Sequence, residues 1–296
     1  MNYHSEALIR DISAKAQRFR LHVLEMVYSA QSGHIGGAFS AAEIVASLFF
    51  HQMRLDPKKP DWVDRDRLLF SKGHACAILY TALAYKGFFP VEELLTFRKM
   101  NSRLQGHPDP IKTPGVEAAA GPLGHGICIG VGMALAARMR DIKPSSQTSP
   151  SAMASPTRTF VLCGDGELNS GVIWEGVMAA AKFKLGNLTV ILDYNGIQQT
   201  GATADVMPTE PIAPKWEAFG WHTQEIHGHN VREVLEALDR AAEVHARPSV
   251  IIARTTKGRG VKLFEYDNRW HGQAPNKEQY EAAKRELEEG LKAWQS

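Results

Sequence analysis

Two polar residues, Asp165 and Asn195, stand thirty residues apart, each just after an apolar stretch. The first stretch, residues 160–163, stops at Gly164-Asp165-Gly166, and the second covers residues 188–192. A carboxylate and an amide oxygen suit a hard cation such as Mg²⁺ that also holds phosphate oxygens. Gly-Asp-Gly alone is more often a tight turn. The second apolar stretch that leads to an asparagine favours a metal and phosphate site instead.

A strand, a loop, a helix and a second strand are needed to bring these residues together. Residues 159–198 fit that order, with an amphipathic segment between the two apolar stretches. In a right-handed unit of this kind both strand ends open on one edge of a parallel sheet, where doubly wound folds bind ligands. The Gly166 N–H is expected to be free for a phosphate near the start of the helix, whose dipole favours anions. We therefore predict an α/β fold with a doubly wound parallel sheet flanked by helices.

Histidines beside glycines form the second set of candidate residues. His34, His74, His107 and His125 each follow a glycine in a segment that we expect to be a loop or the edge of an element. A single histidine is more often structural than catalytic. Four in such loops indicate a ligand site, because glycine lets the backbone approach a ligand closely and function concentrates in loops.

The rest of the chain predicts further helices and strands. Apolar residues recur at helical spacing over residues 5–29. Ser40, with Glu43 three residues later, predicts a capping box at the start of the next helix. Residues 196–214 are expected to be a loop because their prolines break regular structure. The other predicted elements are strands at 66–70, 220–226 and 249–254, a helix that reaches residue 85, and helices at 40–52, 91–98, 127–139, 231–245 and 277–294.

The composition is that of an ordinary folded protein. The chain has 296 residues, 44% of them hydrophobic, and its net charge of +2 comes from interspersed acidic and basic residues. This pattern gives no sign of a nucleic-acid or membrane partner. We expect one domain over residues 1–296, with a flexible insertion at 141–158 where Ser, Thr and Pro are frequent. The basic run Lys257, Arg259 and Lys262 is expected to be solvated, although it could screen an anionic ligand.

The cysteines and the N-terminus indicate the cellular compartment of the protein. Cys76, Cys128 and Cys163 lack the spacing of a disulfide pair or a zinc site, which fits reduced thiols. The N-terminus has no apolar core behind a basic start, and no apolar run approaches eighteen residues. We expect neither a signal peptide nor a membrane span, and we predict a cytoplasmic location.

Several separate motifs resemble those of transketolase. The span from Gly-Asp-Gly to Asn195 resembles the thiamine diphosphate motif, and the resemblance extends from about residue 5 to residue 275. The matching motifs are Ser32-Gly33-His34, Lys72-Gly73-His74-Ala75, Gly106-His107-Pro108, Gly121-Pro122-Leu123-Gly124, Gly164-Asp165-Gly166, Lys184-Leu185-Gly186-Asn187-Leu188 and His271-Gly272. The resemblance implies the N-terminal, thiamine diphosphate-binding subunit of a split transketolase, which transfers a two-carbon ketol unit from a ketose or its phosphate to an aldose or its phosphate.

The resemblance also implies roles for individual residues. The Ile197 carbonyl would join Asp165 and Asn195 around Mg²⁺, or around Ca²⁺ or Mn²⁺ in its place. The implied catalytic residues are His34, His74, His107 and His271, and the implied cofactor contacts are His74, Gly121, Leu123, Gly124, Gly166, Glu167, Asn195, Ile197 and His271. Imidazoles suit the accompanying proton transfers because their reference pKa of about 6.5 lies close to neutrality.

A partner subunit follows from the resemblance, which covers the cofactor-binding domain of the family. A separate C-terminal subunit is expected to supply the glutamate that activates the cofactor and the acceptor site. The expected assembly contains two copies of each chain, and its expected substrates are small sugars. This chain alone is expected to be inactive. Two positions depart from the family. Asn169-Ser170 stand where members often carry a glutamate, although Glu175 is nearby, and His125 stands where many carry glutamine.

Two other functions remain open. Another thiamine diphosphate enzyme, such as a 2-oxoacid dehydrogenase component or a deoxyxylulose phosphate synthase-like subunit, would share the cofactor motif, but His107 and His271 favour a sugar donor. A non-catalytic relative would keep the fold without the cofactor. The intact Asp165, Gly166 and Asn195 argue against that alternative.

Overall fold

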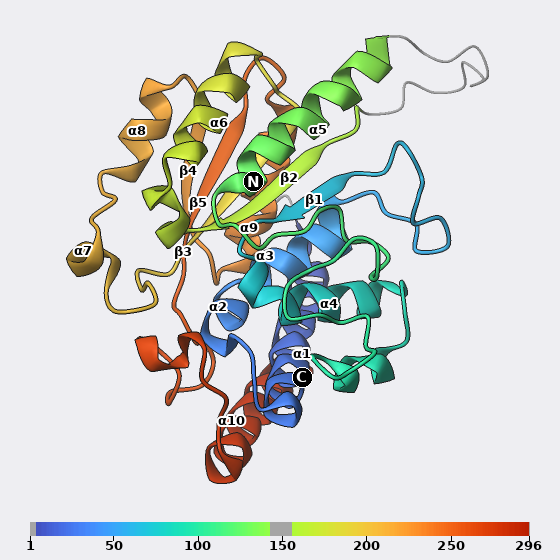
Figure 1. Cartoon of the computed structure of the whole chain (residues 1–296), viewed down its shortest axis with the longest axis vertical. Coiled ribbons are helices and arrows are strands. Elements are labelled where there is room, and N and C mark those ends of the chain that lie inside the picture. The colour runs from blue at the N-terminus through green and yellow to red at the C-terminus, as the bar shows by residue number, and fades with distance from the viewer. Residues whose placement is uncertain (1–3, 143–155, 296) are drawn as a thin grey trace.

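A five-stranded parallel β-sheet forms the centre of the computed structural model, which describes residues 4–142 and 156–295 (Figure 1). The strands are β1 (Arg67–Phe70), β2 (Thr159–Gly164), β3 (Leu188–Tyr194), β4 (His222–His227) and β5 (Ser249–Arg254). Their spatial order is β1-β2-β3-β5-β4, and each neighbouring pair is parallel. The predicted parallel sheet is confirmed.

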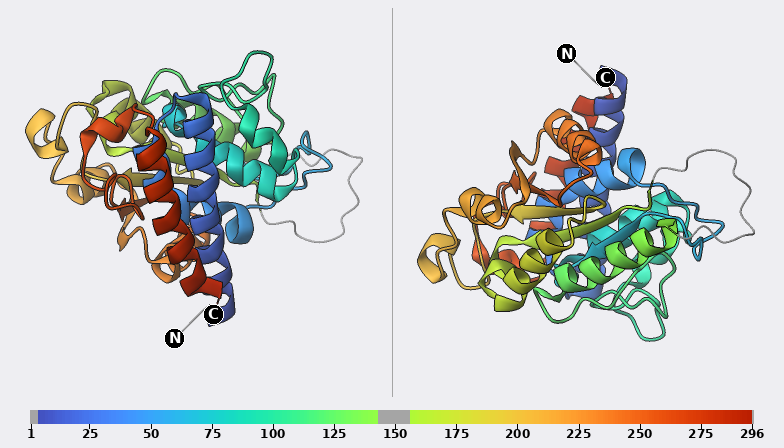
Figure 2. Two further views of the ribbon diagram at one scale, coloured as in Figure 1. Left: turned by 90° about the horizontal axis from the view of Figure 1, so that it is seen from below. Right: turned by 90° about the horizontal axis from the view of Figure 1, so that it is seen from above.

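Helices cover both faces of this sheet (Figure 2). One face carries α5 (His125–Ile142), α6 (Gly171–Lys182) and α8 (Ile212–Ala218). The other face carries α1 (Glu6–Ala30), α3 (Ala42–Ser47), α4 (Cys76–Lys86) and α9 (Val231–Glu243). The last helix, α10 (Lys277–Gln295), runs along α1, where the rings of Tyr28 and Tyr280 stack with centroids 4.1 Å apart. The doubly wound arrangement is therefore also confirmed.

Alternating side chains along the strands build two separate cores. Leu68 and Phe70 of β1 join the core on the side of α1 and α4, whereas Leu69 joins the core on the side of α5 and α6. Successive side chains of a strand point to opposite faces, so a strand covered on both sides is apolar at every position. The apolar stretches at 160–163 and 188–192 have this character. The sheet is thus a rigid base for the loops at its carboxyl edge.

The prediction of one helix at residues 40–52 is wrong, because helical structure begins earlier and is divided into separate elements. The chain forms α2 (Ile35–Ser40), α3 and a π-helical turn, η1 (Leu48–Gln52). The predicted capping box does not form. Ser40 Oγ donates to Asp193 Oδ2 at 2.6 Å, and Glu43 Oε2 accepts from the Arg20 guanidinium at 2.6 Å. Both side chains are buried, so tertiary contacts use the oxygens that would have capped the helix.

Residues 196–214 contain more regular structure than expected. The short helix α7 (Thr203–Val206) lies within them, and α8 begins at Ile212. Pro214 falls in the first turn of α8, where the missing N–H costs no helical hydrogen bond. The predicted helix at 91–98 is a shorter 3-10 helix, η3 (Val91–Thr96). The other 3-10 turns are η2 (Gly73–Ala75), η4 (Asp165–Asn169) and η5 (Asn268–His271).

Three further expectations concern the chain as a whole. Most of the expected insertion at 141–158 lies outside the described residues. Within the described part of the chain, the helices are too short or too polar to cross a membrane. Cys76, Cys128 and Cys163 are free thiols, as expected.

Candidate functional site

A cavity of about 200 Å³ lies at the carboxyl edge of the sheet, where β2, β3 and β5 end. The loops after these strands form its walls, together with segments that precede α4 and α5. This is the edge at which open parallel sheets bind ligands. The predicted site residues that line it are His74, Leu123, Asp165, Gly166, Glu167, Asn195, Ile197 and His271.

Asp165 contributes a nearly fully buried carboxylate to this cavity. Its Oδ2 accepts hydrogen bonds of 2.9 Å from the Gly196 N–H and from the Thr203 hydroxyl. Burial raises the pKa of Asp165, and the hydrogen bonds only partly oppose that rise. A cation close to the carboxylate would lower the pKa again, because opposite charge favours the ionised form.

Gly166 does not have the free N–H that was predicted for a helix start. It lies in η4, α6 begins at Gly171, and the Gly166 N–H donates to Asp165 Oδ1 at 3.0 Å. The expected closeness of Asp165 and Asn195 is confirmed, since Asp165 binds the N–H of the residue after Asn195. The Asn195 amide oxygen accepts from the Ile197 N–H at 3.1 Å, which shapes the turn after β3.

Three of the four predicted catalytic histidines gather in one place. The ring centroids of His34, His74 and His271 lie 5.0 to 5.3 Å apart. Burial, reinforced by neighbouring cationic side chains, lowers the pKa of His34 to about 4 and that of His271 to about 3. The same causes lower the pKa of His74 well below its usual value. Desolvation thus lowers the pKa of these imidazoles below the reference value of about 6.5 and keeps them uncharged at pH 7.

The low histidine pKa values predict a loss of stability in mild acid. His34 takes up a proton near pH 6.5 when the chain is unfolded but only near pH 4 when it is folded. Between these values the unfolded state binds more protons, so the free energy of unfolding falls as the pH falls through this window. The Tm of the wild type is expected to drop more steeply from pH 6.5 to pH 4 than that of His34→Asn.

Calorimetry of both proteins across this window measures the effect. The buried carboxyls of Asp165 and Glu167, whose pKa values are raised, act in the opposite direction. They are present in both proteins, so the difference between the two curves isolates His34. Parallel curves would contradict the low pKa.

Four predicted site residues lie outside the lining of the cavity, namely His34, His107, Gly121 and Gly124. His107 and Gly121 are exposed. The His107 imidazole is still near enough to His34 to lower its pKa. Gly124 is buried and has φ +87°, a left-handed conformation that favours glycine.

Glu167 ties three segments together at the wall of the cavity. Its carboxylate accepts hydrogen bonds from Ser71 Oγ at 2.5 Å, from the Gly124 N–H at 2.8 Å and from the Gly164 N–H at 2.9 Å. Burial raises the pKa of Glu167. Since its oxygens already bind these groups, Glu167 positions the loops before α5 and after β2.

A buried ion pair joins Lys72 and Asp193, neither of which was assigned a role from the sequence. Lys72 Nζ also donates to the Gly37 carbonyl at 2.8 Å, and Asp193 accepts from the hydroxyls of Ser40 and Thr255. Burial acts to raise the pKa of Asp193, but Lys72 and these hydrogen bonds outweigh it and lower the pKa. The available signal was a carboxylate directly after the apolar stretch that forms β3.

Lys257 faces the cavity and is buried, although its basic run was expected to be solvated. Its Nζ donates to the carbonyls of Ile197 at 3.2 Å and Gln198 at 3.3 Å, and it lies 2.9 Å from His271 Nδ1. Burial and the charge of Lys72 lower the pKa of Lys257 to about 8. The Ile197 carbonyl, which was expected to bind a cation, therefore faces a positive charge.

The positions that depart from the family pattern do not line the cavity. His125 is the first residue of α5 and is exposed. Ser170 immediately precedes α6 and packs near Gly124, and Glu175 in α6 is exposed. These three residues therefore lie near the loops that border the cavity and not in its lining.

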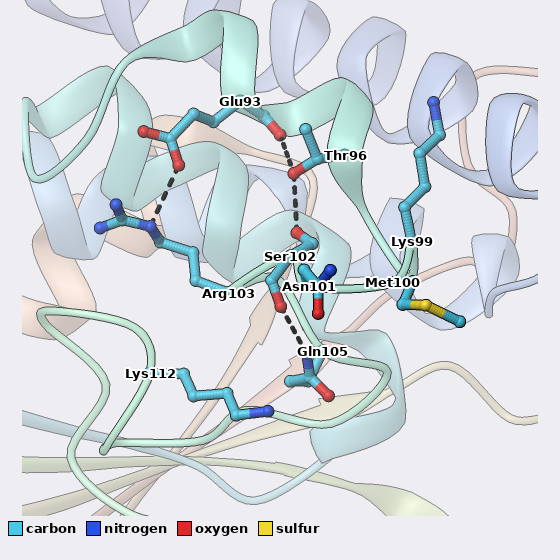
Figure 3. Close-up of a pocket in the computed structure, with 9 residues that line it drawn as sticks. All are labelled: Glu93, Thr96, Lys99, Met100, Asn101, Ser102, Arg103, Gln105 and Lys112. Carbon is cyan, nitrogen blue, oxygen red and sulfur yellow. Dashed lines mark hydrogen bonds and ion pairs between the residues drawn. The ribbon is translucent and has the colours of Figure 1, made fainter.

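A larger and more open hollow, of about 990 Å³, lies among residues 93–112 (Figure 3). Several of its polar side chains pair with one another. Arg103 binds Glu93 at 3.0 Å, and Thr96 Oγ1 lies 2.7 Å from Ser102 Oγ. The hollow contains none of the predicted site residues. The smaller cavity, with its acid, imidazoles and oxygen atoms, is therefore the candidate functional site.

The chain resembles known proteins over most of its length. Residues 12–293 match the family described as "Transketolase, thiamine diphosphate binding domain". The chain is 38% identical over 278 residues to the 6-deoxy-6-sulfo-D-fructose transketolase subunit SqwG of Clostridium sp. (strain MSTE9), covering 94% of this chain and 96% of that relative. It is 38% identical over 283 residues to one subunit of the apulose-4-phosphate transketolase of Phocaeicola vulgatus, covering 96% of each.

Solved transketolases share the fold. The transketolase of Campylobacter jejuni superposes with a TM-score of 0.84 and 32% identity, over 96% of this chain and 45% of that chain. A transketolase from Pichia stipitis superposes with a TM-score of 0.82 and 31% identity, again over 96% and 45%. This chain thus spans about 45% of the length of these solved enzymes. It belongs to the transketolase family and forms the thiamine diphosphate-binding domain of that family.

Proposed function

We propose that this chain is the thiamine diphosphate-binding subunit of a two-chain transketolase, which transfers a two-carbon ketol unit from a ketose to an aldose. The observation that carries this proposal is the convergence of three uncharged imidazoles and the oxygens of Asp165, Asn195 and Ile197 at one sheet edge. Relatives that this chain covers over 96% of their length are named transketolase subunits, which supports the same assignment. We assign residues 1–296 to one domain.

The oxygens around Asp165 fit a hard divalent cation. The Asp165 carboxylate, the Asn195 amide and the Ile197 carbonyl belong to residues that line one cavity, and such oxygens are the ligands that Mg²⁺ prefers. Lys257 now donates to the Ile197 carbonyl, so its ammonium would have to move away from this oxygen when the ion binds. We therefore assign Mg²⁺, or Ca²⁺ or Mn²⁺, to these three residues.

The surrounding wall fits a diphosphate group. His34 Nδ1 and Gln198 Nε2 are buried without a hydrogen-bond partner among the described residues, so polar atoms remain for a ligand. A metal ion on Asp165 Oδ1 would free the Gly166 N–H for a phosphate oxygen. The residues that we assign to the cofactor are His74, Gly121, Leu123, Gly124, Gly166, Glu167, Asn195, Ile197 and His271. When bound, thiamine diphosphate supplies the electron sink for cleaving the carbon–carbon bond beside a ketose carbonyl.

The histidines would orient the sugar and move its protons. An uncharged imidazole carries one N–H donor and one acceptor nitrogen. His34 and His74 can therefore each accept from one hydroxyl group and donate to another at pH 7. His271 Nδ1 already faces the Lys257 ammonium, so His271 offers a hydroxyl group only its N–H. His107 would join them from the exposed side of His34. Exclusion of water from this group would protect the reacting carbon.

A C-terminal transketolase subunit would complete the site. Leu123 is 44% exposed at the cavity, which leaves an apolar surface for the cofactor and the partner to cover. The partner would supply the activating glutamate and the acceptor site, in an assembly with two copies of each chain. Small sugars are the proposed substrates, and neither nucleic acid nor membrane is a proposed partner. We place this enzyme in the cytoplasm.

Reconstitution is expected to give activity only when both chains are present. This chain, a purified C-terminal transketolase subunit, Mg²⁺ and thiamine diphosphate are expected to convert a ketose and an aldose by two-carbon transfer, measured by chromatography of both products. Each chain by itself serves as a control and is expected to be inactive. No turnover with any common ketose donor would count against the proposal, and release of CO₂ from pyruvate would replace it with a 2-oxoacid enzyme.

A further inference from the structure

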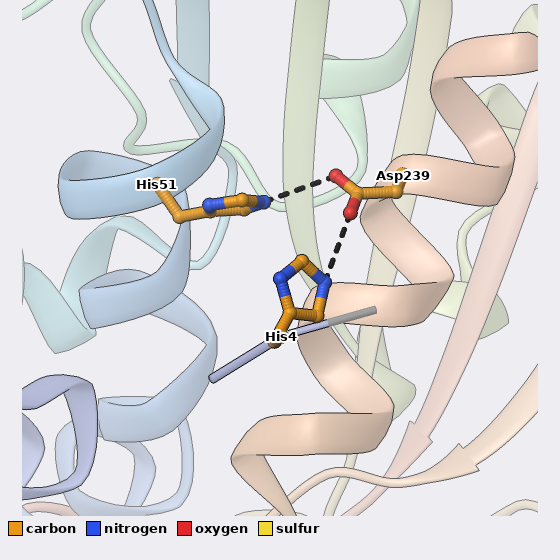
Figure 4. A group of neighbouring side chains, drawn as sticks. All are labelled: His4, His51 and Asp239. Atoms are coloured by element: carbon orange, nitrogen blue, oxygen red, sulfur yellow. Dashed lines mark hydrogen bonds and ion pairs between the residues drawn. The ribbon is translucent and has the colours of Figure 1, made fainter. Parts of the chain in front are cut away.

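A second group of metal-ligating side chains lies outside the catalytic cavity (Figure 4). His4 precedes α1, His51 belongs to the π-helical turn η1, and Asp239 belongs to α9. His4 Nε2 lies 2.9 Å from Asp239 Oδ2, and His51 Nε2 lies 3.0 Å from Asp239 Oδ1. The ligand atoms of all three residues lie within 4.8 Å of one another.

The His4 imidazole provides an independent sign of a ligand. Its side chain is 7% exposed, and its Nε2 is buried. Although this nitrogen is close to the Asp239 carboxylate, the geometry is not that of a hydrogen bond, and the described residues offer it no other partner. Buried polar atoms are nearly always satisfied in native proteins, so an exception needs an explanation such as a bound ion.

The spacing of the three side chains suits a zinc-type ion. Bonds of about 2.0–2.1 Å to nitrogen and oxygen place the ligands of a tetrahedral Zn²⁺ ion roughly 3.3 Å apart. The observed separations run from 2.9 Å up to the 4.8 Å limit, so small side-chain rotations bring the atoms to this distance. Two imidazoles and one carboxylate form a ligand set that Zn²⁺ accepts, with water in the fourth position. We propose that His4, His51 and Asp239 bind a divalent metal ion of the zinc type.

This metal site lies away from the proposed thiamine diphosphate site. α9 follows the carboxyl end of β4 and runs back along the sheet, so Asp239 in its second half lies toward the amino edge. Arg158, just before β2, donates to the Ala242 carbonyl at the end of α9, which fixes that end at the amino edge. None of the three metal ligands lines the catalytic cavity.

A bound ion would link the segment before α1 to η1 and α9, which lie on the same face of the sheet. The existing links there are weak. The Arg232 guanidinium donates to the His4 carbonyl at 3.4 Å and pairs with Glu6, whose side chain is 71% exposed. η1 is a π-helical turn, and such turns occur often at functional sites. The ion would therefore have a structural role and hold the N-terminal segment against the rest of the domain.

Metal uptake by the full-length protein without an affinity tag tests this proposal. The protein is treated with a chelator and dialysed against Zn²⁺, with Mg²⁺ and thiamine diphosphate in excess. We expect one zinc ion per chain by atomic emission, and a tetrahedral Co²⁺ absorption spectrum when Co²⁺ replaces zinc. His51→Gln and Asp239→Asn are each expected to lose this uptake. The Asp239 side chain is 40% exposed, so its amide variant should fold even if another variant does not.

Two further variants separate this site from others. His22→Gln is the matched control, because His22 also contacts a carboxylate, Glu25 at 3.6 Å, but has no second histidine in its group. It is expected to take up zinc like the wild type. His271→Asn reports on zinc bound among the catalytic imidazoles. Uptake that persists in His51→Gln and Asp239→Asn would overturn the proposal, and so would no uptake by the wild type. Neither outcome bears on the transketolase assignment.

Discussion

Replacing Asp165 with alanine is expected to abolish the stabilisation that Mg²⁺ and thiamine diphosphate give to the assembled enzyme. A ligand present at about 100 times its Kd that binds only the native state raises the free energy of unfolding by roughly 2.7 kcal/mol. Asp165 supplies the negative charge of the proposed metal site, whereas Asn195 and Ile197 supply neutral oxygens. Without that charge the metal ion and the diphosphate that it holds are expected to be lost, together with activity.

The rise in the free energy of unfolding on addition of Mg²⁺ and thiamine diphosphate must be measured for each variant against the same variant without them. Asp165→Ala also leaves the Gly196 N–H and the Thr203 hydroxyl without their acceptor, which costs about 1–3 kcal/mol for each buried group. Asp165→Asn keeps the shape and an acceptor oxygen while removing the charge, and we expect it to lose most of this rise as well. Asp205→Ala, on the exposed side of α7, is the control and should retain the full rise. If Asp165→Ala kept the full rise in the free energy of unfolding, the metal ion would have to bind at other residues.

Lys72→Met is expected to lower the free energy of unfolding by about 3–5 kcal/mol, because it leaves an uncompensated buried charge. Lys72 is 1% exposed and Asp193 is 0% exposed, so water cannot replace the lost partner. Ser40 and Thr255 still donate to Asp193, which favours the lower end of this range. Asp193→Ala leaves the Lys72 ammonium facing the Gly37 carbonyl and is expected to cost at least as much. Urea unfolding of each variant measures these losses.

A double variant distinguishes charge from packing. Lys72→Met combined with Asp193→Leu removes both charges, and buried ion pairs replaced by apolar side chains of similar volume are often neutral or stabilising. We therefore expect the pair of substitutions to recover most of the loss. Glu236→Gln, which faces Arg240 across 3.7 Å on the outer side of α9, is the control and should change stability by less than about 0.5 kcal/mol. If Lys72→Met lowered the free energy of unfolding by a similarly small amount, other groups would have to compensate the charge of Asp193.

The sequence predicted the sheet and the position of the acid and the amide with good accuracy. Apolar stretches that end at polar residues mark strands buried on both faces of a parallel sheet. Gly164 at the end of β2 lies opposite Asp193 in β3, and this pairing brings Asp165 and Asn195 to the same edge. Of the four histidines in glycine-flanked loops, His34 and His74 gather at this edge, whereas His107 and His125 are exposed. The third histidine of the cluster, His271, was indicated only by the resemblance to transketolase.

The sequence could not predict which partner each polar side chain takes. Ser40 and Glu43 matched a capping box, yet Ser40 binds Asp193, which is 153 residues away in the chain. Lys257 matched a solvated basic run, yet it binds the Ile197 carbonyl, 60 residues away. Local patterns describe only the backbone and the average burial of a segment. Such contacts depend on residues that meet only when the whole fold forms.

By itself, the amino-acid sequence determined the doubly wound sheet and the edge at which the candidate site lies, because these follow from its periodicity. It indicated the family through the resemblance of its motifs to those of transketolase. Only the tertiary structure decided the charge states within the site. Burial keeps the three histidines uncharged, Lys72 and the hydrogen bonds to Asp193 lower the pKa of that carboxylate against its burial, and folding turns Lys257 into the cavity. A pKa depends on desolvation and on charges brought close by folding, and neither quantity is present in a stretch of sequence.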